Sequence, residues 1–323
     1  MVDNKVAFLF SGQGAQFPGM GKDLWESYGC VKELFVLASD ICSMDMKSLL
    51  FEGSIEDLKE TQNTQIAVTL VNLSVLRALK EEGIRSSCSA GFSLGEFSAM
   101  TDAGILAESD VFSLVSKRGE IMSSSANKVV KRFGEVGMGA VVGLDFETVQ
   151  KVLKDSQVSD VYAANNNSPV QVVISGTAAG IAGVQDVLKA AGARRIIPLK
   201  VSGPFHTPLL NSGKEELADF LGTLTFANPV KDFYSNVTGT LVSTGEEARE
   251  LSIQQMVSPV QWLVIEKNIG SSGIMRLAEA GPGTVLTGLW KKSGMGQDIF
   301  SCGTLEGLNR LLGSINHSEN EEG

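Results

Sequence analysis

Residues 87–100 read SCSAGFSLGEFSAM, and this stretch decides the expected fold. A short run typical of a buried strand stops at Gly91, and helix-like sequence begins at about Gly95. Residues 91–95 (GFSLG) fit the G-x-S-x-G pattern, whose glycines permit a sharp strand-to-helix turn that exposes a serine hydroxyl at the helix N-terminus. The pattern predicts Ser93 as a nucleophile. The alternative is an ordinary turn in which Ser93 only caps the helix.

The order of strand, turn and helix recurs along the chain. Residues 5–10 (KVAFLF) form an apolar run that stops at the Gly-rich residues 11–14, and residues 64–81 carry an apolar stripe at helical spacing. Helix-like sequence also follows at about 21–37. This alternation predicts an α/β fold with a parallel sheet covered by helices on both faces.

The middle of the chain has a different rhythm. Between about 136 and 201, six short elements follow in the order strand, helix, strand, strand, helix, strand, with the second helix expected near 177–191. This βαββαβ order is that of a ferredoxin-like module. After it come a helix at 212–221 and a strand at 231–237. We expect a discontinuous large α/β domain, an inserted small domain and a frayed acidic tail, at residues 1–128 with 204–314, 129–203 and 315–323.

The composition restricts the kind of protein. The chain has 323 residues, of which 43% are hydrophobic and 20% charged, enough for one large core or two domains. Its net charge of −10 disfavours binding to nucleic acid or to an anionic membrane surface. No apolar run approaches the ~18 residues that span a bilayer, and the N-terminus lacks a signal-peptide core, so we expect a cytoplasmic protein. Four scattered cysteines without a C-x-x-C pair predict free thiols and no metal site.

A serine nucleophile needs a base, and the chain contains only two histidines, His206 and His317. His317 lies in the charged tail. His206 lies in residues 202–208 (SGPFHTP), a loop after the last strand of the small domain, where a cleft residue is expected. We therefore predict His206 as the base. The alternative is a partly buried structural histidine.

Two further features suggest an anionic ligand or intermediate. The SGQGAQ turn at residues 11–16 fails the dinucleotide pattern, because Phe17 stands where a third glycine is needed, but its backbone N–H groups can face an oxyanion. The N–H of Leu94 would be the second donor. Arg118, in a helix-like stretch, is either a surface arginine paired with Glu120 or a clamp for a substrate carboxylate.

Basic residues also cluster in this acidic chain. They suit phosphates or an acidic protein, although solvated charge is the commoner explanation. They are Lys189, Arg194, Arg195 and Lys200, and again Lys291 and Lys292.

Taken together, the motifs resemble those of malonyl-CoA:acyl carrier protein transacylases, a family that includes the acyltransferase domains of polyketide and fatty acid synthases. The resemblance covers nearly all of the chain except the tail. Its motifs are GQGAQ at 12–16, TQIA at 64–67, GFSLGEFSA at 91–99, KRG at 117–119, NNNSP at 165–169, FHTP at 205–208, SPVQW at 258–262 and EAGPG at 279–283.

The resemblance implies an α/β-hydrolase-like large domain, a ferredoxin-like small domain and a set of residue roles. Ser93 matches the acylated nucleophile, His206 the general base, and Gln261 the residue whose backbone carbonyl orients the imidazole. The N–H groups of Gln13 and Leu94 match the oxyanion hole. The remaining residues match positions that contact the substrate. Arg118 would pair with the malonate carboxylate, and Gln65 and Asn167 would line the cleft. Phe205 would leave little room for an α-methyl branch, which favours malonyl over methylmalonyl.

The implied activity is transfer of malonyl from CoA to the phosphopantetheine thiol of acyl carrier protein through a malonyl-Ser93 ester, for fatty acid synthesis. We expect no cofactor and a monomer. Phe92 replaces the histidine usual in the family, which removes a polar group near the acyl pocket, so acyl choice can be broader than malonyl. Ile66 replaces the usual proline. The alternatives are a stand-alone polyketide-type acyltransferase, a serine hydrolase or esterase, and a binding subunit that kept only the fold.

Overall fold

The computed structural model describes the backbone of residues 5–320 and the side chains of residues 5–316. Its larger part is built on a sheet of five parallel strands in the order β7-β2-β1-β8-β9. The central strand β1 is wholly buried, and its Phe10 pairs with Gly91 on one side and Ala280 on the other. The strands are β1 (Val6–Phe10), β2 (Ser86–Gly91), β7 (Asp232–Phe233), β8 (Arg276–Ala280) and β9 (Asp298–Ser301).

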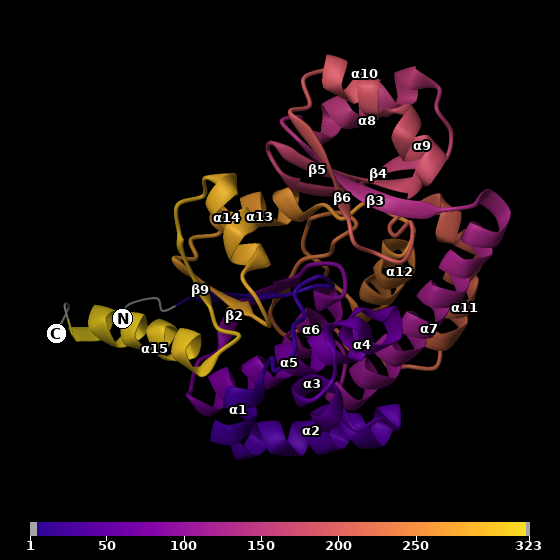
Figure 1. Ribbon diagram of the computed structural model, residues 1–323. Coiled ribbons are helices and arrows are strands. Elements are labelled where there is room, and N and C mark those ends of the chain that lie inside the picture. The colour runs from indigo at the N-terminus through magenta and orange to yellow at the C-terminus, as the bar shows by residue number, and fades with distance from the viewer. Residues whose placement is uncertain (1–4, 321–323) are drawn as a thin grey trace.

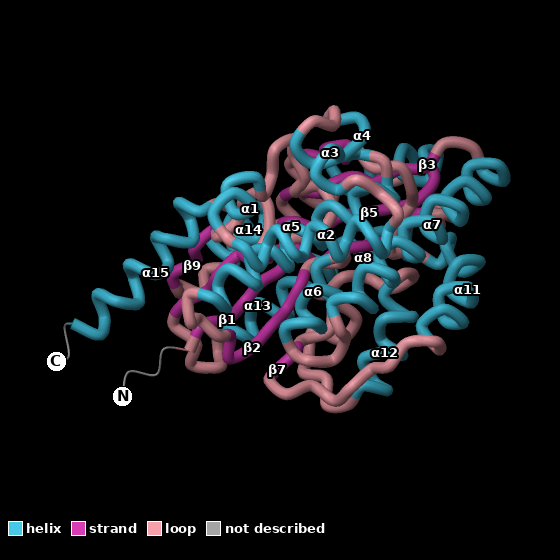
Figure 2. The backbone as a smooth tube through the Cα atoms, turned by 90° about the horizontal axis from the view of Figure 1, so that it is seen from below, coloured by secondary structure: helices cyan, strands magenta, loops and turns pink. Residues whose placement is uncertain are grey.

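Helices cover both faces of this sheet, as the alternating sequence predicted. Phe8 and Phe10 of β1 point into one core and Ala7 and Leu9 into another, because successive side chains of a strand face opposite sides. Figure 2 shows β1 and β2 running between the helices. The first core includes α1 (Lys22–Ser27), α2 (Gly29–Cys42), α3 (Met46–Phe51), α4 (Ile55–Lys59), α5 (Thr61–Glu81), α6 (Gly95–Asp102), α7 (Glu108–Phe133) and α15 (Leu305–Asn320), and the second α13 (Trp262–Gly270) and α14 (Val285–Ser293).

A second sheet of four antiparallel strands, in the order β4-β5-β3-β6, lies over the first part (Figure 1). Val141 and Ile174 on one face pack against a helical layer, whereas Met138 and Ala140 on the other face join the core of the larger part. The elements are β3 (Val136–Val142), α8 (Phe146–Ser156), β4 (Val161–Ser168), β5 (Gln171–Thr177), α9 (Ala178–Gly183), α10 (Gln185–Ala190) and β6 (Arg195–Leu199).

Several element boundaries differ from those predicted. The helix expected at 21–37 is two helices, because Tyr28 adopts an extended backbone between them. The helix expected at 177–191 divides after Gly183, in a segment with two glycines, which favour helix poorly. The strand expected at 231–237 pairs only at Asp232–Phe233. The remaining elements are η1 (Pro208–Leu210), α11 (Asn211–Leu221) and α12 (Gly245–Gln255).

The predicted frayed tail is helical over most of its length. Helix α15 continues to Asn320, and its Leu311 and Ile315 are buried against the main core. Residues 321–323 lie outside the described part of the chain. The helical spacing of the apolar residues in α15 was the sequence signal for this packing against the core, and the polar, acidic composition of the tail argued against it.

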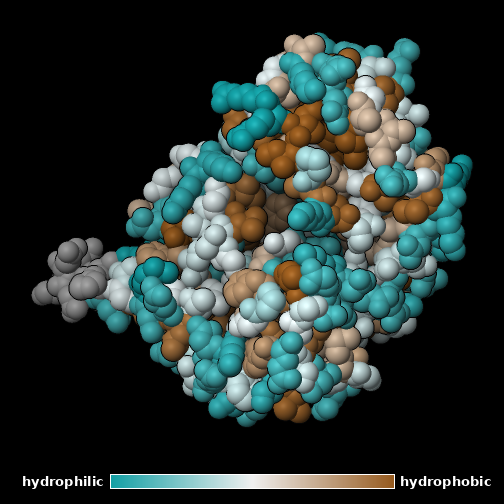
Figure 3. Space-filling model, in the orientation of Figure 1, coloured by the Kyte–Doolittle hydropathy of each residue, from teal (hydrophilic) through white to brown (hydrophobic). Residues whose placement is uncertain are grey.

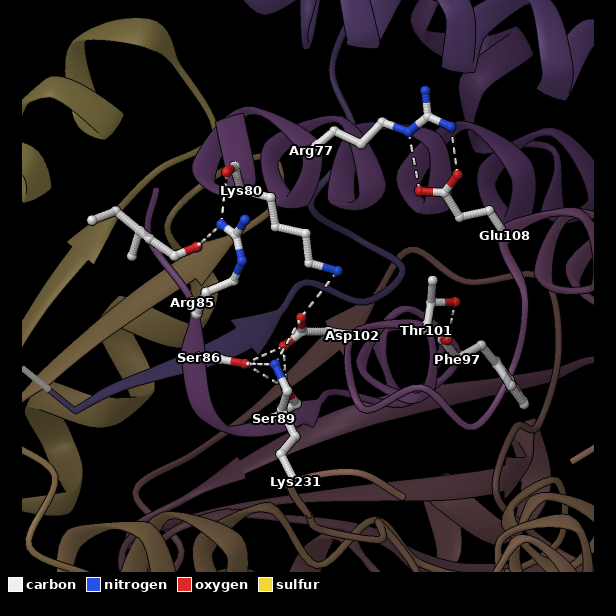
Figure 4. A network of polar contacts seen from close by, with 11 residues as sticks. Arg77, Lys80, Arg85, Ser86, Ser89, Phe97, Thr101, Asp102, Glu108 and Lys231 are labelled. Atoms are coloured by element: carbon white, nitrogen blue, oxygen red, sulfur yellow. Dashed lines mark hydrogen bonds and ion pairs between the residues drawn. The ribbon is translucent and has the colours of Figure 1, made fainter. Parts of the chain in front are cut away.

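A polar network fixes the start of β2, at the end of the strand remote from residue 93 (Figure 4). The buried carboxylate of Asp102, at the end of α6, forms ion pairs with Lys80 of α5 at 3.5 Å and Lys231 at 3.3 Å. It also accepts a hydrogen bond from the Ser86 hydroxyl. The network joins α5, α6, β2 and the chain leading to β7, so it stabilises the scaffold at the end of the sheet remote from the predicted nucleophile.

Candidate active site

Ser93 lies at the turn between β2 and α6. Its φ of 51° is in the left-handed region, which a residue with a side chain rarely adopts. A Cβ added at Gly91 would lie 2.0 Å from the carbonyl carbon of Gly95, and one added at Gly95 would lie 2.1 Å from the carbonyl oxygen of Phe10. Both glycines are therefore required by close backbone approach, as the G-x-S-x-G pattern predicted.

His206 meets Ser93 from the other side of the cleft. Its Nε2 is 2.8 Å from the Ser93 Oγ, although the two residues are 113 positions apart in sequence. Its Nδ1 lies 2.9 Å from the backbone carbonyl of Gln255. Because a carbonyl can only accept, Nδ1 carries the proton and Nε2 has a free lone pair for the serine proton.

The prediction for Gln261 was wrong, because the carbonyl that orients His206 belongs to Gln255. The Gln261 carbonyl accepts the N–H groups of Val264 and Ile265 in the first turn of α13. Its side chain accepts a hydrogen bond from Asn166 at 3.2 Å. By contrast, Gln255 ends α12, and the last carbonyls of a helix have no partner within it. The sequence signal was therefore the end of a helix, which the SPVQW motif does not mark.

The environment of His206 keeps the imidazole neutral. Burial lowers its pKa to about 4, and the positive charge of Arg118 acts in the same direction. The hydrogen bond to the Gln255 carbonyl opposes this shift only partly. At neutral pH the ring is therefore in the form that can accept a proton from Ser93.

Two backbone donors lie beside Ser93. Leu94 is the N-cap of α6, and Gln13 lies in the loop that follows β1. A Cβ at Gly12 would lie 2.3 Å from the carbonyl oxygen of Phe92, so this loop packs directly on the turn. Within residues 5–320, neither the Gln13 nor the Leu94 N–H donates to a protein acceptor. Both are free to receive an oxyanion.

Arg118 is buried in α7, with 1% of its surface exposed. Its two terminal nitrogens donate to the side-chain oxygens of Gln65 at 2.6 Å and Gln255 at 2.9 Å, and its Nε has no partner. Burial lowers its pKa to about 10, so the group stays charged at neutral pH. The alternative of a surface pair with Glu120 is wrong, because Glu120 pairs with Lys117.

These groups border a cleft of about 400 Å³ between the two parts of the molecule. Figure 3 shows the hollow and the hydrophobic surface within it. Its lining includes the predicted Gln13, Phe92, Ser93, Asn167, Phe205 and His206. Gln65 and Arg118 lie behind the lining, where the Gln65 side chain reaches that of Gln13 at 3.5 Å.

The wall of the cleft holds two features relevant to ligands. The ring of Phe92 packs edge-on against Trp262 at 5.4 Å between centroids. The buried side-chain oxygen of Asn167 has no hydrogen-bond partner, so it can accept one from a ligand. Among the described residues there is no cluster of three or more metal-ligating side chains, and no helix is long and apolar enough to cross a bilayer.

A serine in a strained turn, a neutral imidazole and two free N–H donors lie together in this cleft, an arrangement that suits the transfer of acyl groups. The chain belongs to the acyl transferase family: the family model described as the acyl transferase domain matches residues 7–306.

Proteins of similar sequence and structure match this chain over almost its whole length. The malonyl CoA-acyl carrier protein transacylase of Bacillus subtilis is 39% identical over 90% of both chains. The crystal structure of the transacylase of the same name from Clostridium perfringens superposes with a TM-score of 0.93 at 33% identity, covering 98% of this chain and 99% of that one. A third match is a chain from the complex of a type II polyketide synthase acyl-carrier protein with its malonyl-transacylase. Its TM-score is 0.90 at 33% identity, and the match covers 96% of this chain and 99% of that one.

Proposed function

We propose that this protein is a malonyl-CoA:acyl carrier protein S-malonyltransferase that supplies fatty acid synthesis. The observation that carries the proposal is the 2.8 Å contact between Ser93 Oγ and His206 Nε2, beside a buried and charged Arg118. The 39% identity to a malonyl CoA-acyl carrier protein transacylase, over 90% of the chain, supports the same substrates.

The reaction proceeds in two half-reactions. His206 Nε2 takes the Ser93 proton while Oγ attacks the thioester carbonyl of malonyl-CoA. The negative oxygen is stabilised by the N–H groups of Gln13 and Leu94. The carbon–sulfur bond then breaks, the imidazolium returns its proton to the CoA sulfur, and malonyl-Ser93 remains. In the second half, His206 deprotonates the phosphopantetheine thiol of acyl carrier protein, and its sulfur attacks the ester carbonyl. The carbon–oxygen bond to Ser93 then breaks, and the imidazolium returns its proton to Ser93 Oγ.

Acyl choice depends on Arg118 and on the cleft wall. Arg118 uses two of its five N–H donors on neutral amides, so its charge is not balanced by hydrogen-bonded carboxylates and can pair with the malonate carboxylate. Gln65 holds this arginine, and Asn167 offers an acceptor in the cleft. The bulk of Phe205 favours malonyl over methylmalonyl. Phe92 removes a polar group from the wall, and it is the observation that favours a broader, polyketide-type acyl choice as the second candidate.

Carrier protein would dock at the basic cluster by the cleft. Arg194 and Arg195 are exposed at the start of the edge strand β6, and Lys200 lines the cleft. Lys292 also reaches this rim, where it contacts the cleft residue Gln171 at 3.5 Å. Such a patch suits an acidic partner, because opposite charges speed and orient association.

The proposal includes the finer description of the fold. The strand order β6-β3-β5-β4, with two crossing helical connections on one face, supports a ferredoxin-like small domain at 129–203. A serine between β2 and α6 of a parallel sheet supports an α/β-hydrolase-like large domain at 1–128 and 204–314. We further propose a cytoplasmic monomer that works without a cofactor.

The test is intact-protein mass spectrometry after brief exposure to malonyl-CoA. We expect the mass to rise by one malonyl group in the native protein and not in Ser93→Ala, and to return to its first value when carrier protein bearing phosphopantetheine is added. Malonyl-carrier protein should appear in equal amount. Release of free malonate instead would identify a hydrolase, and no mass increase would reject the proposal.

A further inference from the structure

Glu96 is a fully buried carboxyl group that the proposed reaction does not use. It lies in the first turn of α6, three residues after Ser93, with 0% of its surface exposed. It accepts hydrogen bonds from the backbone N–H of Asn236 at 2.8 Å and from the side-chain Nε2 of Gln255. The Ser235 side chain is a third hydrogen-bond partner. A buried carboxyl is costly unless it is well bonded, and two of these partners, Asn236 and Gln255, connect it to the site.

The first partner, Asn236, holds the nucleophile turn. Its side-chain oxygen accepts the N–H of Ser93 at 2.6 Å, and its side-chain nitrogen donates to the carbonyl of Gly91 at 2.6 Å. The amide therefore bridges the residues on either side of position 92. This bridge supports the left-handed backbone of Ser93, which needs such support to persist.

The second partner, Gln255, contacts the other groups of the site. Its backbone carbonyl holds the Nδ1 of His206, and its side-chain oxygen accepts from Arg118. Its side-chain nitrogen, besides reaching Glu96, donates to the carbonyl of Ser93 at 2.9 Å. One residue thus connects the base, the nucleophile and the arginine, the base through its backbone carbonyl and the other two through its side chain.

We propose that Glu96 is a positioning residue that sets the Ser93–His206 pair by holding Asn236 on one side and Gln255 on the other. In serine triads a carboxylate contacts the histidine directly. Here the backbone carbonyl of Gln255 contacts the histidine, and the carboxylate of Glu96 contacts Gln255 instead of the imidazole. A carboxylate suits this position because both of its oxygens accept, whereas an amide has only one acceptor oxygen for two donors. The inference rests on the proposed function, since it assigns a role within that site.

The test compares Glu96→Gln with a matched control, Asp102→Asn. Glu96→Gln keeps the size of the side chain but leaves one donor facing an N–H group. We expect kcat for acylation of Ser93 by malonyl-CoA to fall by about 10- to 100-fold, because a small misplacement of reacting groups costs that much, with KM unchanged. Asp102→Asn removes a buried carboxylate from the far end of the same helix. It should lower Tm and leave both constants at their native values.

A second measurement separates this role from malonyl transfer. Phenylmethylsulfonyl fluoride forms a sulfonyl ester on an activated serine and releases fluoride, without using Arg118. Its reaction with Ser93 should slow at least tenfold in Glu96→Gln and less in Glu96→Asp, which keeps both acceptor oxygens.

The outcomes are distinct. If Glu96→Gln is folded by its Tm and reacts with both reagents at native rates, the positioning role is rejected. A loss no greater than that in Asp102→Asn rejects it too. If the native protein takes no malonyl from CoA but the sulfonylation rate still depends on Glu96, the proposed function fails and the positioning role survives.

Discussion

Replacing Arg118 with alanine should reduce malonyl transfer much more than acetyl transfer. The guanidinium is buried, and its hydrogen bonds go to neutral amides, so in the complex the malonate carboxylate would be left in a site without its counter-charge. Removing one partner of a buried ion pair costs about 3–5 kcal/mol. At 1.36 kcal/mol per factor of ten, this corresponds to a loss of about 150- to 5,000-fold in kcat/KM for malonyl-CoA.

Acetyl-CoA has no carboxylate, so its acylation of Ser93 should fall by less than about tenfold, the effect of the bond lost from Gln255. The assay is the rate of mass increase with each donor. Arg118→Lys should fall between native and alanine variants, because it keeps the charge and loses the fork. Lys117→Ala, which removes a neighbouring surface cation, serves as the control. Equal losses for malonyl and acetyl groups would refute the carboxylate clamp.

Three further predictions follow from charge. Burial lowers the pKa of His206 to about 4 and raises that of Glu96 to about 7, so the pH–rate profile of Ser93 acylation tests His206 in Glu96→Gln, where it should stay level down to about pH 5 and fall through about pH 4; an acid limb near pH 6.5 in that variant would contradict the buried, neutral imidazole. Burial raises the pKa of Glu266 from its usual 4.5 to about 8, so the folded protein holds a proton that the unfolded chain has lost, and stability should fall as pH rises from 4.5 to 8. Glu266→Gln should lessen that fall in urea unfolding at pH 5 and pH 8, and an unchanged pH dependence would show that this carboxyl is not its source. Reversing both charges in Arg194→Glu with Arg195→Glu should raise KM for carrier protein and leave the acylation rate unaltered, whereas slower acylation would argue against docking there.

The contact between Ser93 and His206 was predictable because the residue types present left few choices. The G-x-S-x-G pattern identifies Ser93, and a chain with two histidines leaves one candidate outside the tail. The alternation of strands and helices likewise predicts the parallel sheet. These features depend on local sequence and on residue type, which the chain states directly.

The groups that surround the pair were not predictable in the same way. Arg118 becomes a buried cation only because Gln65, Gln255 and Phe97 reach it from three other helices. The carbonyl that contacts His206 is set by the residue at which α12 ends. The side chain of Asn236 reaches Ser93 because the chain leaves the sheet soon after β7 begins. Each of these contacts joins elements that are distant in the sequence, so the residue spacing within one segment cannot predict it.

The pairing of β1 has a consequence for synthesis of the chain. Its register joins residues 6–10 to residues 276–280, so one edge of the central strand stays open until the ribosome has made nearly the entire polypeptide. Pairing between such distant segments forms slowly, and an open strand edge invites association with other chains. We therefore expect nascent chains stalled before residue 276 to require a chaperone, whereas chains that extend beyond β9 should fold unaided.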